Sequence, residues 1–164
     1  MEYPKRKHPR LKEFDYSENG CYFVTVCTKN RANVLSTVAV GRGALTPPSV
    51  RLSAWGRVAE KYILNIQNVY PHILVEKFVI MPNHIHLLLT ISNPANGGVR
   101  APRPTSLSEI VRGFKSLTTR EIGKPIWQTS FYDHVVRTDR DDLQVWQYIN
   151  NNPAKWAEDE YYQQ

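Results

Sequence analysis

Two strand-like segments joined by three residues constrain the fold of this chain more than any other feature. Residues 72–80 (HILVEKFVI) and 84–91 (HIHLLLTI) are rich in β-branched and other apolar side chains, and residues 81–83 (MPN) predict a tight turn between them. The uninterrupted apolar run at residues 87–89 predicts that the second strand is covered on both faces. We therefore expect a sheet in which this strand is buried.

The remaining segments alternate between strand and helix patterns. The predicted elements are a strand at 21–28, a helix from Leu52 to about Tyr70, a helix opened by a capping box at Ser106–Glu109, a strand at 131–137, and a helix that starts at Thr138 or Asp139 and precedes Pro153. The order is strand–helix–strand–strand–helix–strand–helix. It predicts an α+β fold: a ferredoxin-like split βαβ antiparallel sheet with helices on one side and an added C-terminal helix.

The length of 164 residues favours one domain with short terminal extensions. We expect a basic N-terminal arm at residues 1–12, a domain at 13–156 and a C-terminal tail at 157–164. Two segments, 36–50 and 93–105, are rich in proline and glycine, so we expect them to be mobile loops within the domain.

The positive charge of the chain is concentrated at its beginning. The formal charge is +6, and residues 1–12 carry a net +4 of it. A basic arm of this kind is typical of segments that lie on phosphates, because each neutralised phosphate releases counterions; a solvated terminus is the alternative. The cations expected to contact a polyanion are Lys5, Arg6, Lys7 and Arg10 in the arm, and Arg112 and Lys115 on the polar face of the second helix.

Several classes of protein are excluded or unsupported by the sequence. No apolar run is long enough for a transmembrane helix, and the first ten residues lack the apolar core of a secretory signal. We expect a cytoplasmic protein in which Cys21 and Cys27 are reduced strand residues. A P-loop, a dinucleotide-binding glycine motif, a zinc-ribbon cysteine pair and a serine-hydrolase elbow are all missing, so we expect no nucleotide cofactor.

The sequence His84-Ile85-His86 places two imidazoles two residues apart. On a strand, both side chains point to the same face and can share one metal ion. The pair alone is weak evidence, because two histidines on a polar strand face are also common without a ligand. A histidine-triad hydrolase is a poorer match, since the third alternate position is Leu88.

The last predicted helix carries a second pair of interest. Leu143, Trp146 and Ile149 define its expected buried stripe, and Tyr148 and Asn152 lie about 40° apart on the wheel, off that stripe. A tyrosine and an asparagine stacked in this way can serve one site. They can equally be a boundary tyrosine and a helix-ending asparagine before proline.

Three blocks of sequence together resemble a known family. They are residues 81–89 (MPNHIHLLL), 127–137 (WQTSFYDHVVR) and 148–155 (YINNNPAK). In this order and spacing they are similar to the REP-associated tyrosine transposases of the single-tyrosine HUH superfamily, which process single-stranded DNA. The resemblance covers about residues 10–156 and implies a ferredoxin-like sheet with the histidine pair on a central strand. Ala154, Trp156 and the two long loops depart from the family pattern, and the loops bear on DNA specificity.

The resemblance implies a role for each matching residue. His84 and His86 become metal ligands, Asn152 the third ligand, and Tyr148 the nucleophile that forms a 5′-phosphotyrosine without needing ATP. The expected cofactor is a divalent metal, Mg²⁺ or Mn²⁺. Tyr132, which is beside an aspartate and a histidine, is a competing nucleophile on chemical grounds.

The implied function is that of a metal-dependent endonuclease and strand transferase acting on single-stranded or hairpin DNA from repetitive extragenic palindromes. A domesticated hairpin-DNA-binding protein with little or no turnover is the alternative, and an unrelated metal-binding α/β domain is a third interpretation. No membrane partner is expected. The sequence leaves open whether the protein is a monomer or a homodimer.

Overall fold

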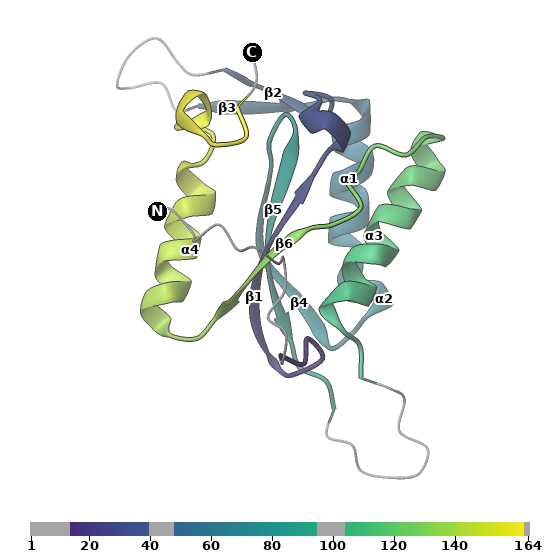
Figure 1. Cartoon of the computed structure of the whole chain (residues 1–164), viewed down its shortest axis with the longest axis vertical. Coiled ribbons are helices and arrows are strands. Elements are labelled where there is room, and N and C mark those ends of the chain that lie inside the picture. Colours follow the sequence, from purple (N-terminus) through teal and green to yellow (C-terminus); the bar gives the residue numbers. More distant parts are fainter. Residues whose placement is uncertain (1–13, 40–47, 95–103, 163–164) are drawn as a thin grey trace.

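A four-stranded antiparallel sheet is the centre of the computed structural model, which describes residues 14–39, 48–94 and 104–162 (Figure 1). The strands are β1 (Gly20–Cys27), β4 (Ile73–Ile80), β5 (His84–Ile91) and β6 (Tyr132–Val136). Their order in space is β4–β5–β1–β6. This is the order of a split βαβ sheet, so the predicted fold class is confirmed. The basic arm with Lys5, Arg6, Lys7 and Arg10 lies outside the described residues.

One face of the sheet carries the main hydrophobic core. Helices α1 (Ala54–Leu64), α2 (Ile66–Val69) and α3 (Leu107–Ile122) belong to this side of the molecule (Figure 1). The fully buried side chains of this core include Ile85, Leu87 and Leu89 of β5 and Ile63, Leu107 and Ile110 of the helices. Burial of this apolar surface is the main stabilising contribution to the fold.

The C-terminal helix α4 (Asp139–Asn151) covers the opposite face (Figure 1). Val145 and Ile149 of α4 pack with Phe23 of β1 and Leu88 of β5 in a second, smaller cluster. Because side chains alternate along a strand, the two histidines of β5 lie on the same face as Leu88. The added C-terminal helix is thus confirmed, and it is placed over the histidine pair.

The buried stripe of α4 differs from the predicted one. The sequence predicts Leu143, Trp146 and Ile149, but Leu143 is 58% exposed and Trp146 is 36% exposed, whereas Val145 is fully buried. Trp146 lies at the surface, where Lys77 of β4 places its Nζ atom 4.2 Å from the centre of the indole ring. The helix therefore turns Tyr148 toward the small cluster, where it is partly buried.

Local capping explains where two of the helices begin and end. Ser106 accepts a hydrogen bond from the backbone of Glu109, and the Glu109 carboxylate accepts one from the backbone of Ser106, which confirms the predicted capping box. Gly123 ends α3 in the left-handed region, at φ = 82°. Thr138 caps α4 through the backbone N–H of Asp141.

Two predicted segments differ in detail. The helix expected at 52–70 begins only after its cap, Ser53, and is divided at Asn65 into α1 and α2. The loop prediction for 36–50 is wrong at both ends, because β2 (Ser36–Ala39) and β3 (Ser49–Leu52) pair as a two-stranded sheet. Their β-branched residues outweigh the flanking glycines and prolines.

The remainder of the two predicted loops, residues 40–47 and 95–103, lies outside the described residues. In the parts of the chain that the structure describes, no helix is both long enough and apolar enough to cross a membrane.

Candidate metal and tyrosine site

His84 and His86 lie side by side on β5, beneath the C-terminal part of the chain. Their ring centres are 4.5 Å apart, and both side chains are buried, at 0% and 1% exposure. Neither Nε2 atom has a hydrogen-bond partner among the described residues. A buried polar nitrogen without a partner lowers stability, so this arrangement indicates a ligand for the two nitrogens.

Neighbouring side chains set the tautomer of the histidines. Asn83 donates its amide N–H groups to the carbonyl oxygens of Arg31 and Tyr161, at 3.2 and 2.6 Å, so its Oδ1 is the atom that faces His84 Nδ1 at 2.9 Å. An amide oxygen only accepts, and therefore His84 Nδ1 carries the proton and Nε2 keeps its lone pair. Thr25 Oγ1 lies 2.8 Å from Nδ1 of His86 and can hold that ring in the same tautomer.

Burial keeps both imidazoles neutral. It lowers the pKa of His84 to about 3, an effect that contact with Asn152 opposes and the charge of Arg31 reinforces. Burial also lowers the pKa of His86 well below its ordinary value, and the neighbouring His84 acts in the same direction. Neutral imidazole is the form that binds metal ions.

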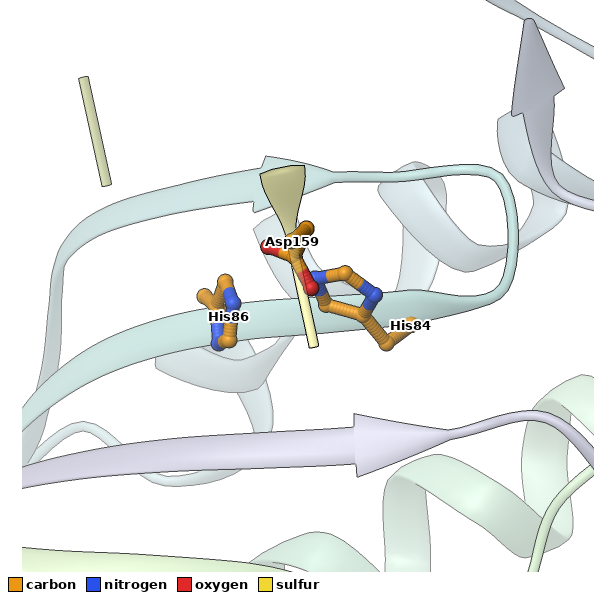
Figure 2. A group of neighbouring side chains, drawn as sticks. All are labelled: His84, His86 and Asp159. Carbon is orange, nitrogen blue, oxygen red and sulfur yellow. The ribbon is translucent and has the colours of Figure 1, made fainter. Parts of the chain in front are cut away.

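Asp159 brings a carboxylate to the histidine pair, although it follows α4 by several residues. One ligand atom from each of His84, His86 and Asp159 lies within 4.8 Å of the others. Figure 2 shows the Asp159 carboxylate directed toward the two rings from the segment above β5. Burial raises the pKa of Asp159, and hydrogen bonds from the backbone of Tyr161 and the side chain of Asn152 oppose this rise.

Asn152 connects the end of α4 to the same cluster. Its Nδ2 donates to Asp159 Oδ2 at 2.8 Å, and its Oδ1 is buried without a partner among the described residues. Two imidazole nitrogens, an amide oxygen and a carboxylate are donors that divalent metal ions accept. The residues present therefore fit a divalent metal.

Tyr148 contacts the histidine pair from α4. Its ring centre is 5.2 Å from that of His86 and 5.8 Å from that of Phe23, both with edge-to-face geometry. Packing of Val145 and Ile149 onto the sheet fixes this position. The structure thus brings together four residues singled out by the sequence: His84, His86, Tyr148 and Asn152.

Tyr132 is less well placed than Tyr148. It lies on β6, opposite Thr25 of β1, so β1 separates it from the histidine strand. Its side chain is 46% exposed. Its neighbour His134 contacts Asp141 at 2.8 Å and so connects β6 to the first turn of α4.

Arg112 and Lys115 are not part of this cluster, because α3 lies on the opposite side of the sheet from α4 (Figure 1). The Lys115 ammonium donates to the carbonyl oxygens of Gln128, Thr129 and Ser130, at 2.8, 3.2 and 2.8 Å. These bonds use its three N–H groups and hold the chain that leads into β6. Arg112 is exposed, and the contacts of Arg112 and Lys115 with DNA stay predictions.

Residues 157–162, expected as a tail, pack against the site. Tyr161 is 6% exposed, and its ring centre lies 4.6 Å from that of His84. Arg31 donates to the carbonyl of Glu160 at 3.0 Å and places its guanidinium carbon 4.8 Å from the centre of the Tyr161 ring. The folded unit therefore extends beyond residue 156.

Arg31 holds this segment from a strained turn. Asn30 and Arg31 have φ values of 57° and 53°, in the left-handed region. Asparagine tolerates this region, whereas for arginine it costs about 1–2 kcal/mol. The surrounding contacts compensate, because the backbone of Arg31 bonds to Thr28 and to the Asn83 amide.

Four residues of the site are not predicted from the sequence: Thr25, Arg31, Asn83 and Asp159. The sequence could have indicated Asn83, since an amide directly before the histidine pair can reach a ring nitrogen. No sequence pattern indicates Asp159. Residues 152–159 contain turns and the short helix η2 (Trp156–Glu158), so helical periodicity does not relate Asp159 to Tyr148.

Known proteins resemble this chain over most of its length. The family model for IS200-like transposases matches residues 16–152. An uncharacterized protein of Haemophilus influenzae is 31% identical over 174 aligned residues, which cover 96% of this chain and 93% of that protein. A protein of the same bacterium named as a REP-associated tyrosine transposase is 25% identical and covers 86% of this chain and 74% of its own length.

One solved structure is similar in fold. It is a REP-associated tyrosine transposase bound to a REP hairpin, with a TM-score of 0.59 and 21% identity, covering 95% of this chain and 74% of that one. This chain therefore belongs to the family of IS200-like transposases. The resemblance to the REP-associated tyrosine transposases is confirmed.

Proposed function

We propose that this protein is a metal-dependent single-stranded DNA endonuclease and strand transferase that acts on hairpin or palindromic DNA. One observation carries the proposal: Tyr148 contacts His86, whose Nε2 is buried and has no partner among the described residues. This contact supports the proposal, because it puts the residue that we propose as the nucleophile beside the nitrogens that we propose as metal ligands.

The metal would be held by His84, His86 and Asn152, and we propose Mg²⁺ or Mn²⁺. When bound, it would neutralise charge on the scissile phosphate and orient it. The chain contributes preorganisation, because contacts with Asn83 and Thr25 orient the rings of His84 and His86.

Tyr148 would attack the phosphorus atom of the scissile phosphodiester. The phenol loses its proton, an O–P bond forms to Tyr148, and the bond from phosphorus to the 3′ oxygen breaks. The products are a 5′-phosphotyrosine and a 3′ oxygen that takes up a proton. A second 3′-hydroxyl can reverse the step and join a new strand, because the phosphodiester energy is conserved in the covalent bond.

Binding to folded DNA is supported by the hairpin in the similar solved structure and by the basic arm. We expect Lys5, Arg6, Lys7 and Arg10 to contact phosphates. Deleting residues 1–10 should weaken binding to every DNA by a similar factor. The salt dependence should become shallower by about 0.7 for each single-strand phosphate that the arm no longer neutralises. A change of sequence preference at an unchanged salt slope would contradict this role.

The test of the proposal is a covalent adduct assay with Tyr148→Phe. Labelled single-stranded hairpin DNA is incubated with Mn²⁺ or Mg²⁺ and analysed under denaturing conditions. The native protein should retain label placed 3′ of the nick, and Tyr148→Phe should retain none while still binding the hairpin. Tyr132→Phe is the matched control and should behave like the native protein.

An adduct that persists in Tyr148→Phe and disappears in Tyr132→Phe would reassign the nucleophile. Tight hairpin binding by the native protein, with no cleavage in either metal, would favour the alternative of a domesticated DNA-binding protein.

A further inference from the structure

We propose that Asp159 is a direct ligand of the metal bound by the histidine pair, held in place by Arg31 and Asn83. The inference rests on the proposed metal site and extends it to the segment that follows α4. The site of this chain then has four protein donors: two imidazoles, one amide and one carboxylate.

The distances support direct ligation. Two donor atoms bound to one ion, each about 2.1 Å from it, are separated by at most about 4.2 Å. The ligand atoms of His84, His86 and Asp159 lie within 4.8 Å of one another. A small side-chain adjustment brings all three into range. The carboxylate in Figure 2 approaches the rings on the side where their Nε2 atoms lack partners.

The charge balance of the site gives an independent reason for direct ligation by Asp159. Two neutral imidazoles and an amide leave the charge of a divalent ion uncompensated in a buried site, which is costly. The Asp159 carboxylate would supply negative charge to this donor set. Its orientation is fixed by two hydrogen bonds, one from the backbone N–H of Tyr161 and one from the side chain of Asn152, both 2.8 Å long.

Arg31 and Asn83 position this segment without touching the ion. Arg31 bonds to the carbonyl of Glu160, and Asn83 bonds to the carbonyl of Tyr161. The two residues come from different turns, and Asn83 also bonds to the backbone of Arg31. Asp159 therefore lies in a segment anchored on its C-terminal side, which defines its position over the histidines.

Two consequences follow from the four-donor set. The protein should bind one divalent ion in the absence of DNA. Mixed nitrogen and oxygen donors should also favour Mn²⁺, Co²⁺ or Zn²⁺ over Mg²⁺, which prefers oxygen ligands and retained water.

The test measures Co²⁺ binding to the full chain without DNA, by calorimetry and by visible absorption. Asp159→Asn should weaken Co²⁺ binding at least tenfold and alter the absorption spectrum. Glu158→Gln, a neighbouring exposed residue in the same segment, is the control and should stay within twofold of the native affinity. Circular dichroism of the metal-free proteins checks that both variants are folded.

Arg31→Ala provides a second variant that keeps all four donors. The charge of Arg31 disfavours a cation nearby, as its effect on His84 indicates, so electrostatics alone predicts tighter Co²⁺ binding when this charge is removed. The positioning role predicts weaker binding and a changed spectrum. The direction of the change in Co²⁺ affinity therefore distinguishes the electrostatic effect from the positioning role, even if Asp159→Asn does not fold.

The outcomes distinguish this inference from the proposed function. Native-like Co²⁺ binding in folded Asp159→Asn, together with its loss in His84→Ala, would overturn the role of Asp159 and leave the histidine site in place. If Asp159→Asn does not fold, equal or tighter binding in Arg31→Ala would overturn the inference. Failure of the native protein to bind any divalent ion would reject the metal site as a whole.

Discussion

The two faces of the central sheet are made by the same strands but differ in what they contain. On β5, Ile85, Leu87 and Leu89 enter an apolar core under α1 and α3, whereas His84 and His86 on the other face meet aromatic rings and polar atoms without partners among the described residues. One face is packed like the interior of any small domain. The other face buries polar atoms without partners among the described residues, which lowers stability.

This difference follows from the alternation of side chains along a strand, which puts the residues that stabilise the core and the residues of the proposed site on opposite faces. Residues one position apart on β5 point to opposite faces, so a substitution on one face leaves the other in register. Substitutions on the core face should therefore lower stability alone, whereas substitutions on the site face should also reduce metal binding or cleavage. The following predictions test that separation, from the largest expected effect to the smallest.

His84→Ala should reduce DNA cleavage at least about 100-fold, because an interaction that stabilises charge at the reacting phosphate is removed. Hairpin binding should change little, since DNA is held mainly by other contacts. The measurement is single-turnover cleavage with saturating Mn²⁺. His72→Ala, a histidine outside the site, is the control and should cleave normally. Normal cleavage by His84→Ala would remove the basis for a metal at this position.

Leu87→Ala and Leu88→Ala form a matched pair of adjacent, fully buried leucines on opposite faces. Each should lower the free energy of unfolding by about 2–5 kcal/mol, measured by urea denaturation. At a temperature where both are folded, only Leu88→Ala should also slow cleavage, because Leu88 supports the helix that carries Tyr148. Equal cleavage in the two folded variants would show that the faces are not separated in this way.

Gly56→Ala should lower stability through the core side of the sheet alone. A Cβ at residue 56 would overlap the carbonyl oxygen of Leu35, which accepts a hydrogen bond from Ser53 at the start of α1. Because the overlapping atom belongs to the backbone, overpacking should outweigh the better helix propensity of alanine and cost about 3 kcal/mol in thermal unfolding experiments. Gly113→Ala in α3 meets only the Tyr70 hydroxyl and should be neutral or stabilising. Stability changes of the same sign in Gly56→Ala and Gly113→Ala would contradict this prediction.

Asn83→Ala should weaken metal binding by about 10–100-fold, since Asn83 orients His84, a proposed metal ligand, through its Nδ1 atom. Calorimetric titration with Mn²⁺ measures the effect. Asn68→Ala, an exposed asparagine on α2, provides the control and should bind normally. Unchanged affinity in Asn83→Ala would mean that the histidine ring needs no support from this amide.

The sequence predicts well the features that depend on local pattern. The four strands of the main sheet, the capping box at Ser106 and the start of α4 follow from side-chain alternation, capping chemistry and helical spacing. The histidine pair and Tyr148 follow from their blocks of sequence. Each of these features can be predicted from residues that lie close together in the chain.

Features that depend on packing could not be predicted in the same way. The rotation of α4 appears in its packing, because Val145 and Ile149 contact residues of other elements while Trp146 stays at the surface, and the wheel alone favours the wrong stripe. Asp159 reaches the site through a turn held by Arg31, more than a hundred residues earlier in the chain. No periodicity in the sequence connects these residues.

The pairing of β6 with β1 has a consequence for protein synthesis. β1 lies between β5 and β6, so the sheet stays open on one side until residues 132–136 have been made. Tyr148 and Asp159 follow still later. A ribosome adds about 5–20 residues per second, so an incomplete chain spends seconds with its histidine strand formed but no tyrosine beside it. A nascent chain therefore lacks the tyrosine that we propose as the nucleophile, and translation determines when all residues of the proposed site are present.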